Sequence, residues 1–133
     1  MASPNVFIQA SLIQSLSQLK ETVPGLTVWH IQAAPSTKFP YISLNMQSGG
    51  TVNTSPRDSF EASYKVMCFS DDADQSDLIG GLVRDLFHKT TPLLQGGWNC
   101  YYCKEYKQMQ FTSNVQGNPV YACGSFFEIK TDH

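Results

Sequence analysis

The sequence predicts an α+β fold: a two-layer sandwich in which two helices cover one face of a mainly antiparallel sheet of five or six strands. Two segments carry apolar residues at the three- and four-residue spacing of a helix, and five others alternate or are rich in strand-forming residues. Their order along the chain is helix, three strands, helix and two or three strands. Because the 133 residues contain neither a linker nor an internal repeat, residues 1–133 are expected to form a single domain.

The first helix is predicted to begin at Ser3-Pro4 and to continue through Lys20. Serine accepts hydrogen bonds from the free N–H groups of a helix start, and proline is tolerated at the first helical position. Pro24-Gly25 marks the end of the helical pattern. The expected apolar stripe comprises Val6, Phe7, Ala10, Leu12, Ile13, Leu16 and Leu19.

Two strands are predicted next. Residues 26–31 are rich in strand-forming residues, and the segment 33–36 that follows them has loop composition. Residues 39–47 predict a second strand, entered at Pro40, with one buried face and one solvent face. The residues expected on its buried face are Ile42, Leu44 and Met46, and those on its solvent face are Tyr41, Ser43 and Asn45.

Residues 48–56 (SGGTVNTSP) have the composition of a mobile loop, and they lie between two strands that are otherwise suited to pair. A hairpin turn rarely needs that many residues. Residues 60–69 alternate strictly and predict the clearest strand of the chain. Its two faces are expected to carry Phe60, Ala62, Tyr64, Val66 and Cys68 on one side and Glu61, Ser63, Lys65 and Met67 on the other.

The second helix is predicted to begin at Ser70 or Asp71 and to end near His88-Lys89. Aspartates in its first turns accept hydrogen bonds from free N–H groups, and cations at its end complement the helix dipole. Its apolar stripe comprises Leu78, Ile79, Leu82, Val83, Leu86 and Phe87. Gly80-Gly81 lies inside this stripe. Each glycine costs about 1 kcal/mol relative to alanine, so the pair predicts a close approach of another element.

The last part of the chain is again strand-like. Residues 98–111 and 120–130 predict the final strands, and residues 116–119 (QGNP) supply the turn between them. The sheet face away from the helices is expected to be open or to meet a partner.

The charge content bounds the function. Charged residues make up 15% of the chain and the net charge is −2, with the basic residues scattered. Sequence-specific nucleic-acid binding is not expected, because it relies on clustered Lys and Arg. Residues 1–19 lack the basic start of a signal peptide, and no apolar run is long enough to cross a membrane, so no membrane association is expected. The four cysteines are interpreted as reduced thiols, because a chain of this length can build a core without disulfides.

No metal site or cofactor is expected. Cys100 and Cys103 have the spacing of a zinc half-site, but Cys68 and Cys123 stand alone in the sequence, and a strand would send Cys100 and Cys103 to opposite faces. The aspartates of residues 71–77 lack the glycine and the final glutamate of a calcium loop and are better explained as helix caps.

Enzymatic activity is not expected either. The histidines, His30, His88 and His133, lie in a short strand, at a helix end and at the chain terminus, and no nucleophile elbow or phosphate-binding glycine loop occurs. A catalytic pair brought together by folding remains an open alternative. The aromatic residues Trp98, Tyr101, Tyr102 and Tyr106 favour core and subunit-interface roles over a stacking platform for single-stranded nucleic acid.

The order of elements, together with residues 5–19, 38–46, 62–87 and 120–130, resembles the tail-terminator (tail-completion) proteins of long-tailed bacteriophages. The shared features include a strand entry at Phe39-Pro40-Tyr41, an alternating strand ending at Phe69-Ser70, a helix spaced by Ala73, Ile79 and Val83, and a β-rich end. The resemblance spans nearly the whole chain, and residues 96–111 depart from it most.

The resemblance implies a non-enzymatic virion protein at the junction of tail and neck, assembled in the host cytoplasm. Such a protein forms a ring, with six copies as the expected number, on the last ring of tail tube protein. It stops tube polymerisation and offers a surface to the head-tail connector or neck protein, and DNA passes through rings of this kind. Two alternatives remain: a neck or head-completion protein on the portal side, and a small cytoplasmic ligand-binding or enzymatic α+β domain.

On this interpretation the segment from Ser48 to Asp58 is expected to be a docking arm toward the tube or the neighbouring subunit. Its glycines give freedom and Arg57 gives a charged anchor; the residues singled out are Gly49, Gly50, Thr51, Asn53 and Arg57. The second candidate is the solvent face of the strands at 39–47 and 60–69, through Tyr41, Asn45, Glu61 and Lys65. An ordinary solvated sheet face is the alternative for this second set.

Overall fold

A computed structural model describes residues 4–31, 33, 38–53, 58–88, 94, 96–115 and 117–132. Its elements, in chain order, are helix α1 (Pro4–Ser17), the short 3₁₀ helix η1 (Gln18–Glu21), strands β1 (Thr27–His30), β2 (Tyr41–Asn53) and β3 (Asp58–Ser70), helix α2 (Ala73–Phe87), and strands β4 (Asn99–Val115) and β5 (Asn118–Asp132).

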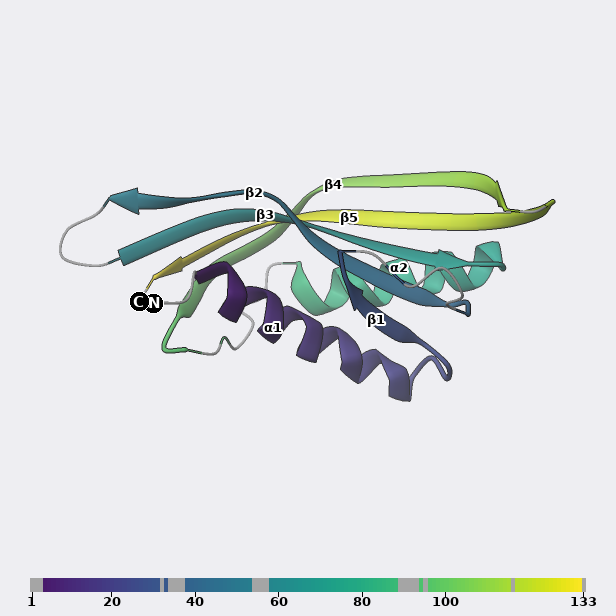
Figure 1. Ribbon diagram of the computed structural model, residues 1–133, viewed down its shortest axis with the longest axis horizontal. Helices are drawn as coiled ribbons and strands as arrows, with labels where there is room; N and C mark the ends of the chain where they lie inside the picture. The colour runs from purple at the N-terminus through teal and green to yellow at the C-terminus, as the bar shows by residue number, and fades with distance from the viewer. Residues whose placement is uncertain are drawn as a thin grey trace.

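The strands form one sheet in the order β1-β2-β3-β5-β4. The β1–β2 pair is parallel, and the other three pairs are antiparallel. Both helices lie on the same side of the sheet (Figure 1). The predicted α+β class, with two helices on one face of a mainly antiparallel sheet, is therefore confirmed, with five strands.

The core lies between the sheet and the two helices. The largest fully buried side chains include Ile8 and Leu16 of α1, Tyr64 of β3 and Phe87 of α2. The Phe87 ring meets Phe127 of β5 edge-on, with centroids 5.5 Å apart. The Tyr64 hydroxyl donates to Asn5 Oδ1 at 2.5 Å, which satisfies a polar group that burial would otherwise penalise.

Helix α1 is rotated relative to the predicted stripe. Ile8, Leu12 and Leu16 face the core at steps of four residues and are at most 2% exposed, whereas Val6 is 55% exposed. Ala10 is exposed as well, so the expectation that Val6 and Ala10 line the core was wrong. Apolar residues occur on more than one side of this helix, and the packing against β1 and β2 selects the side with Ile8.

The predicted loop at residues 48–56 is also corrected. Strand β2 continues through Asn53 and pairs with β3 from Asp58 onward, so residues 48–53 are strand. A register shift between Met46 and Ser48 marks a β-bulge, which absorbs one extra residue and increases the local twist. Residues 54–57 lie outside the described residues. The outer part of the β2–β3 hairpin extends beyond both helices (Figure 1).

Helix α2 begins much as predicted. Asp72 is the N-cap, and its Oδ1 accepts from the Asp74 N–H at 3.0 Å. The predicted close approach holds at Gly80, where an added Cβ would lie 2.6 Å from Cys123 Sγ, but not at Gly81, where nothing lies within 4 Å. Leu78, expected in the apolar stripe, is 57% exposed.

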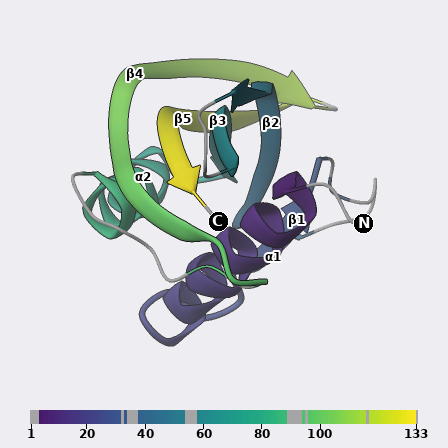
Figure 2. The ribbon, with the colours of Figure 1, turned by 90° about the vertical axis from the view of Figure 1, so that its left-hand side faces the viewer.

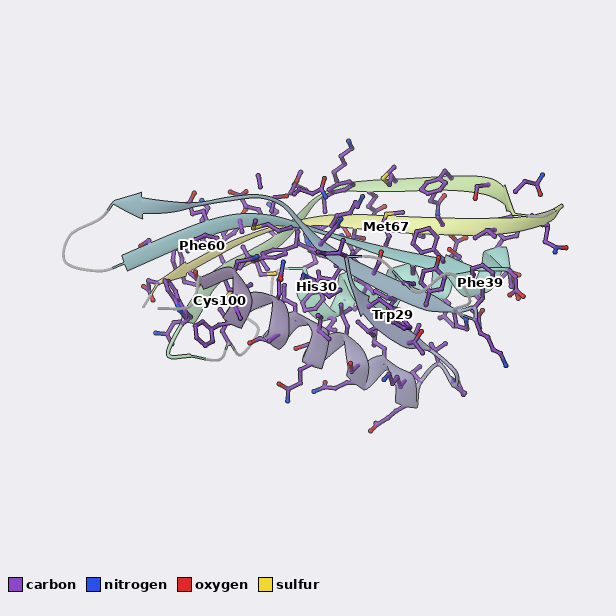
Figure 3. The ribbon with its side chains drawn as sticks, in the orientation of Figure 1. Trp29, His30, Phe39, Phe60, Met67 and Cys100 are labelled. Carbon is purple, nitrogen blue, oxygen red and sulfur yellow. The ribbon has the colours of Figure 1, made fainter. Side chains whose placement is uncertain are left out.

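The prediction that Cys100 and Cys103 point to opposite faces was wrong. Register shifts at Cys100/Tyr102 and Glu105/Lys107 place two β-bulges in β4. The first bulge turns both cysteines toward the helix side, where Cys103 belongs to the core and Cys100 packs against it. Figure 2 shows the resulting bend of β4, and Figure 3 shows Cys100 on the helix side of the sheet.

Candidate functional site

The sheet face away from the helices, called here the open face, has no helix packed on it among the described residues (Figure 1). Its residues follow from the strand register and alternation. Its members are Tyr41, Ser43 and Asn45 of β2, Glu61, Ser63, Lys65, Met67 and Phe69 of β3, Ala122, Gly124, Phe126, Glu128 and Lys130 of β5, and Tyr102, Lys104, Tyr106, Lys107, Met109 and Phe111 of β4.

An aromatic row crosses the open face at the end far from the β2–β3 hairpin. The ring centroids of Phe39 and Tyr41 are 5.6 Å apart, those of Tyr41 and Phe69 are 4.9 Å apart, and those of Phe69 and Phe111 are 6.4 Å apart. Phe111 stays 42% exposed at the end of the row. Partial burial raises the pKa of Tyr41, so its hydroxyl stays protonated near neutral pH.

A methionine pair lies beside the aromatic row. Met67, Gly124 and Met109 are aligned across β3, β5 and β4. An added Cβ at Gly124 would lie 3.2 Å from Met109 Cγ and would overlap the Met67 sulfur, so both side chains extend over the glycine. Met67 lies on this face (Figure 3) and is only 4% exposed, while Met109 is 37% exposed. This half of the open face is therefore apolar.

The half nearer the hairpin carries charge. Lys107 Nζ lies 5.3 Å from the centroid of the Phe126 ring, and Lys130 Nζ lies 4.9 Å from that of Tyr102. Such cation–π contacts hold the lysines against the sheet. Asn45 and Lys65 are direct cross-strand partners, and Asn45 Oδ1 is buried without a hydrogen-bond partner.

A shallow groove of about 520 Å³ lies on the same half of the face. Its lining includes Gly49, Gly50, Glu61, Ser63, Tyr106 and Glu128. The hydroxyls of Ser63 and Tyr106 are hydrogen-bonded to each other across the groove. Gly50 has no atom within 4 Å of its missing Cβ, which leaves the groove open above β2.

The predicted site residues fall into two places. Tyr41, Asn45, Glu61 and Lys65 all lie on the open face, but they are spread from the aromatic row to the groove. The backbones of Gly49, Gly50, Thr51 and Asn53 belong to the outer part of β2. Arg57 lies outside the described residues. The docking role of the arm and of the face stays a prediction.

The sequence did not identify the aromatic row and the methionine pair as parts of one surface. Phe69 and Phe111 lie in strands that were predicted, and alternation alone assigns Phe69 to the face of Lys65. Their alignment with Tyr41 depends on the register Tyr41↔Phe69↔Ala122↔Phe111, which no local pattern reveals.

The two edges of the sheet differ. Strand β1 pairs only with residues 41–44 of β2, so residues 45–53 have no neighbour on that side among the described strands. Strand β4 forms the other edge. At Glu105 this edge is closed, because the Glu105 N–H donates to His88 Nδ1 at 3.1 Å and Glu105 Oε1 lies 3.2 Å from Arg84 Nε. Residues 107–115 have β5 as their one described strand neighbour.

The thiols of β4 show no sign of reactivity. Burial raises the pKa of Cys103 to about 12, with a smaller contribution from the charge of Cys100, and burial also raises the pKa of Cys100. Both are therefore neutral at physiological pH. Among the described residues no group of three or more His, Cys, Asp and Glu side chains is arranged to hold a metal ion. Within the described ranges, no helix is long and apolar enough to span a membrane.

Comparison with known proteins gives a likeness of structure. No protein-family model matches the chain, and no curated protein matches it. Among solved structures, a chain from the virion of a native gene transfer agent particle has a TM-score of 0.77 at 12% identity, covering 100% of both chains. A second solved structure has a TM-score of 0.59 at 12% identity over 96% of each chain. At this identity the likeness shows a shared fold, and that fold occurs in a virion particle.

Proposed function

We propose that the chain is a structural virion protein that forms a ring, of six copies in the simplest case, at the head-proximal end of a phage-like tail tube. The ring stops tube polymerisation and offers the opposite side to a neck or connector protein. The observation that carries the proposal is the end-to-end likeness to a chain of a gene transfer agent virion, with a TM-score of 0.77 over the whole of both chains. The protein acts by binding, and no catalytic step is assigned to it.

The unequal edges of the sheet support ring closure. Residues 45–53 of β2 and residues 107–115 of β4 lie at opposite edges of one sheet. A contact between two different surfaces of identical copies is heterologous, and such contacts close into a ring when the rotation per copy allows it. Along the sheet order β4 runs antiparallel to β2, so β4 of one copy can pair with β2 of the next by ordinary antiparallel hydrogen bonds.

The low charge content fits repeated protein contacts. Charged residues form 15% of the chain, and the apolar half of the open face, from Tyr41 to Phe111, carries none of them. Burying this half between subunits therefore requires no charge to be desolvated.

A proline substitution in β4 tests the edge contact. The Glu105 N–H points away from β5, so Glu105 and Phe127 form a pair without backbone hydrogen bonds. Such pairs recur at every second residue of β5, and one of them is Tyr121 with Thr112. The Thr112 N–H is therefore expected to point away from β5 as well. Thr112→Pro then removes only an outward N–H, which edge strands tolerate. Thr112→Val retains the N–H and is the matched control.

Native mass spectrometry of the 14.8-kDa chain, with and without its tube protein, gives the readout. The wild-type chain and Thr112→Val are expected as a species of six copies, about 89 kDa. Thr112→Pro is expected to stay monomeric in the mass spectrum, and its circular dichroism is expected to match that of the folded wild-type chain. A wild-type chain that stays monomeric in both conditions contradicts the ring, and a ring that binds portal protein but not tube protein moves the site of action to the portal side.

A further inference from the structure

Two cysteines that the sequence places far apart meet under helix α2. Cys68 and Cys123 are direct cross-strand partners in the antiparallel β3–β5 pair, although 55 residues separate them. Directly opposite residues in such a pair have Cα atoms about 4.5–5.5 Å apart, inside the range of about 4.4–6.8 Å that a disulfide spans. Both side chains point to the helix side, since Cys68 is a core residue and Cys123 packs against the core.

The helix leaves room for this sulfur pair. Gly80 of α2 lies directly above it, and a Cβ added there would be 2.6 Å from Cys123 Sγ and 4.0 Å from Cys68 Sγ. Cys68 Sγ also lies 3.0 Å from the carbonyl oxygen of Cys123. The glycine therefore lies over both cysteine side chains and leaves space above them that a larger residue would fill.

The two thiols differ in exposure and acidity. Cys68 is 1% exposed, whereas Cys123 is partly exposed. The hydrogen bond from Cys68 lowers the pKa of Cys123 to about 7, and Gln110 Nε2, 3.9 Å from Cys123 Sγ, adds to this effect. Burial and the carboxylates of Asp77 and Glu105 oppose it. The same hydrogen bond and burial raise the pKa of Cys68.

A second cavity lies beside this place, and Gln110 contacts both. It measures about 220 Å³ and lies between the start of α2 and strands β4 and β5, with Asp77, Gln110 and Ala122 in its lining. Gln110, which lines this cavity, donates through Nε2 to Asp77 Oδ1 at 2.7 Å, and the same Nε2 lies 3.9 Å from Cys123 Sγ.

We propose that Cys68 and Cys123 form a peroxide-reactive dithiol, in which Cys123 is the attacking thiol and Cys68 the resolving thiol. The Cys123 thiolate attacks one oxygen of hydrogen peroxide, so an S–O bond forms, the O–O bond breaks, and hydroxide leaves and takes up a proton as water. Cys68 then attacks the Cys123 sulfur, the S–O bond breaks, and the leaving hydroxide takes the Cys68 proton. Two thiols and one peroxide become one disulfide and two waters.

The disulfide would join the two central strands beneath α2. This site does not depend on ring formation, so it stands or fails separately from the proposed function. If the chain is a virion component, the dithiol persists in the reducing cytoplasm where particles assemble and oxidises after their release.

The test uses the purified chain and hydrogen peroxide, with peptide mapping of the native protein. The first disulfide is expected between Cys68 and Cys123, and the midpoint of urea unfolding is expected to shift upward on oxidation. Cys100 and Cys103 are the internal control, because they lie closer in sequence but have raised pKa values. A first disulfide between Cys100 and Cys103 overturns the proposal, as does a Cys68–Cys123 pair that stays reduced while the urea-unfolded chain oxidises.

Two variants assign the roles. Cys68→Ser is expected to accumulate a sulfenic acid at Cys123, trapped by dimedone, because the resolving thiol is gone. Cys123→Ser is expected to leave Cys68 unmodified, since that sulfur is buried. Dimedone labelling of Cys68 instead of Cys123 in the native chain contradicts the assignment even if neither variant folds.

Discussion

At the scale of single residues, Gly80 and Gly81 are neighbours in one helix but differ in their surroundings. Their occurrence inside an apolar helical stripe predicted a close approach, and the structure places that approach at Gly80 only. The sequence does not reveal which glycine faces the sheet, because a helix rotates by about 100° per residue and its phase depends on tertiary packing.

We expect Gly80→Ala to lower the free energy of unfolding by about 1 kcal/mol and Gly81→Ala to raise it by up to about 1 kcal/mol. Alanine improves helix propensity at both positions. At Gly80, however, the new methyl group would lie 2.6 Å from Cys123 Sγ and forces that side chain out of its hydrogen bonds. Urea denaturation of the two variants gives the comparison.

Repeating Gly80→Ala in a chain that carries Cys123→Ala tests whether the Cys123 sulfur causes the loss of stability. In Cys123→Ala the sulfur is absent, and the nearest remaining atom, the Cβ of residue 123, lies at an ordinary 3.5 Å from the position of the added methyl group. Gly80→Ala is expected to become neutral or stabilising there, which a double-mutant cycle measures as a coupling of about 1 kcal/mol or more. Equal losses in both backgrounds would show that the Cys123 sulfur is not the obstacle.

At the scale of elements, local patterns predicted the type of each element better than its limits or its orientation. Residues 48–53 have loop composition, and they form a strand because β3 offers a continuous partner from Asp58 to Ser63. Tertiary pairing overrides weak local propensity in such segments. In the same way, the β-bulge after Cys100 reverses the expected direction of a cysteine, and a bulge leaves no clear signal in one sequence.

Helix α1 offers a direct test of its rotation. We expect Ile8→Ala to cost roughly 2–5 kcal/mol of stability, because Ile8 is 0% exposed and its removal leaves a cavity against the sheet. Val6→Ala, on the 55% exposed side, is expected to change stability by less than about 0.5 kcal/mol. Thermal or urea unfolding distinguishes the two. A larger cost for Val6→Ala than for Ile8→Ala would mean that α1 packs through the stripe predicted from its sequence, which contains Val6 and not Ile8.

At the scale of the whole molecule, register organises the open face into an apolar half and a charged half. Alternation predicted that Tyr41, Asn45, Glu61 and Lys65 share a face, and the structure agrees. The distance between them along the sheet was not predictable, because it depends on how β2, β3, β5 and β4 are aligned. The β2–β3 hairpin therefore lies at one end of the sheet and the β4–β5 turn at the other (Figure 1).

This arrangement lets each end of the sheet be shortened separately. Deleting Val52, Asn53, Asp58 and Ser59 removes two cross-strand pairs from the β2–β3 hairpin and retains residues 54–57. Deleting Asn114, Val115, Asn118 and Pro119 does the same at the β4–β5 turn. Because side chains alternate with a period of two, removing two residues from each strand keeps every remaining side chain on its own face.

If the hairpin is the arm that docks on the tube, the first deletion yields folded protein that no longer stops tube polymerisation, and electron microscopy shows tubes longer than those capped by the wild-type chain. The second deletion is expected to cap normally, because the altered turn is at the far end of the sheet from the hairpin. Each deletion also shortens one of the two edges proposed to join neighbouring copies by two residues. Circular dichroism therefore separates loss of docking from loss of fold, and native mass spectrometry separates it from loss of the ring. Normal capping by the first variant together with failure of the second would reverse the orientation and place the β4–β5 turn against the tube.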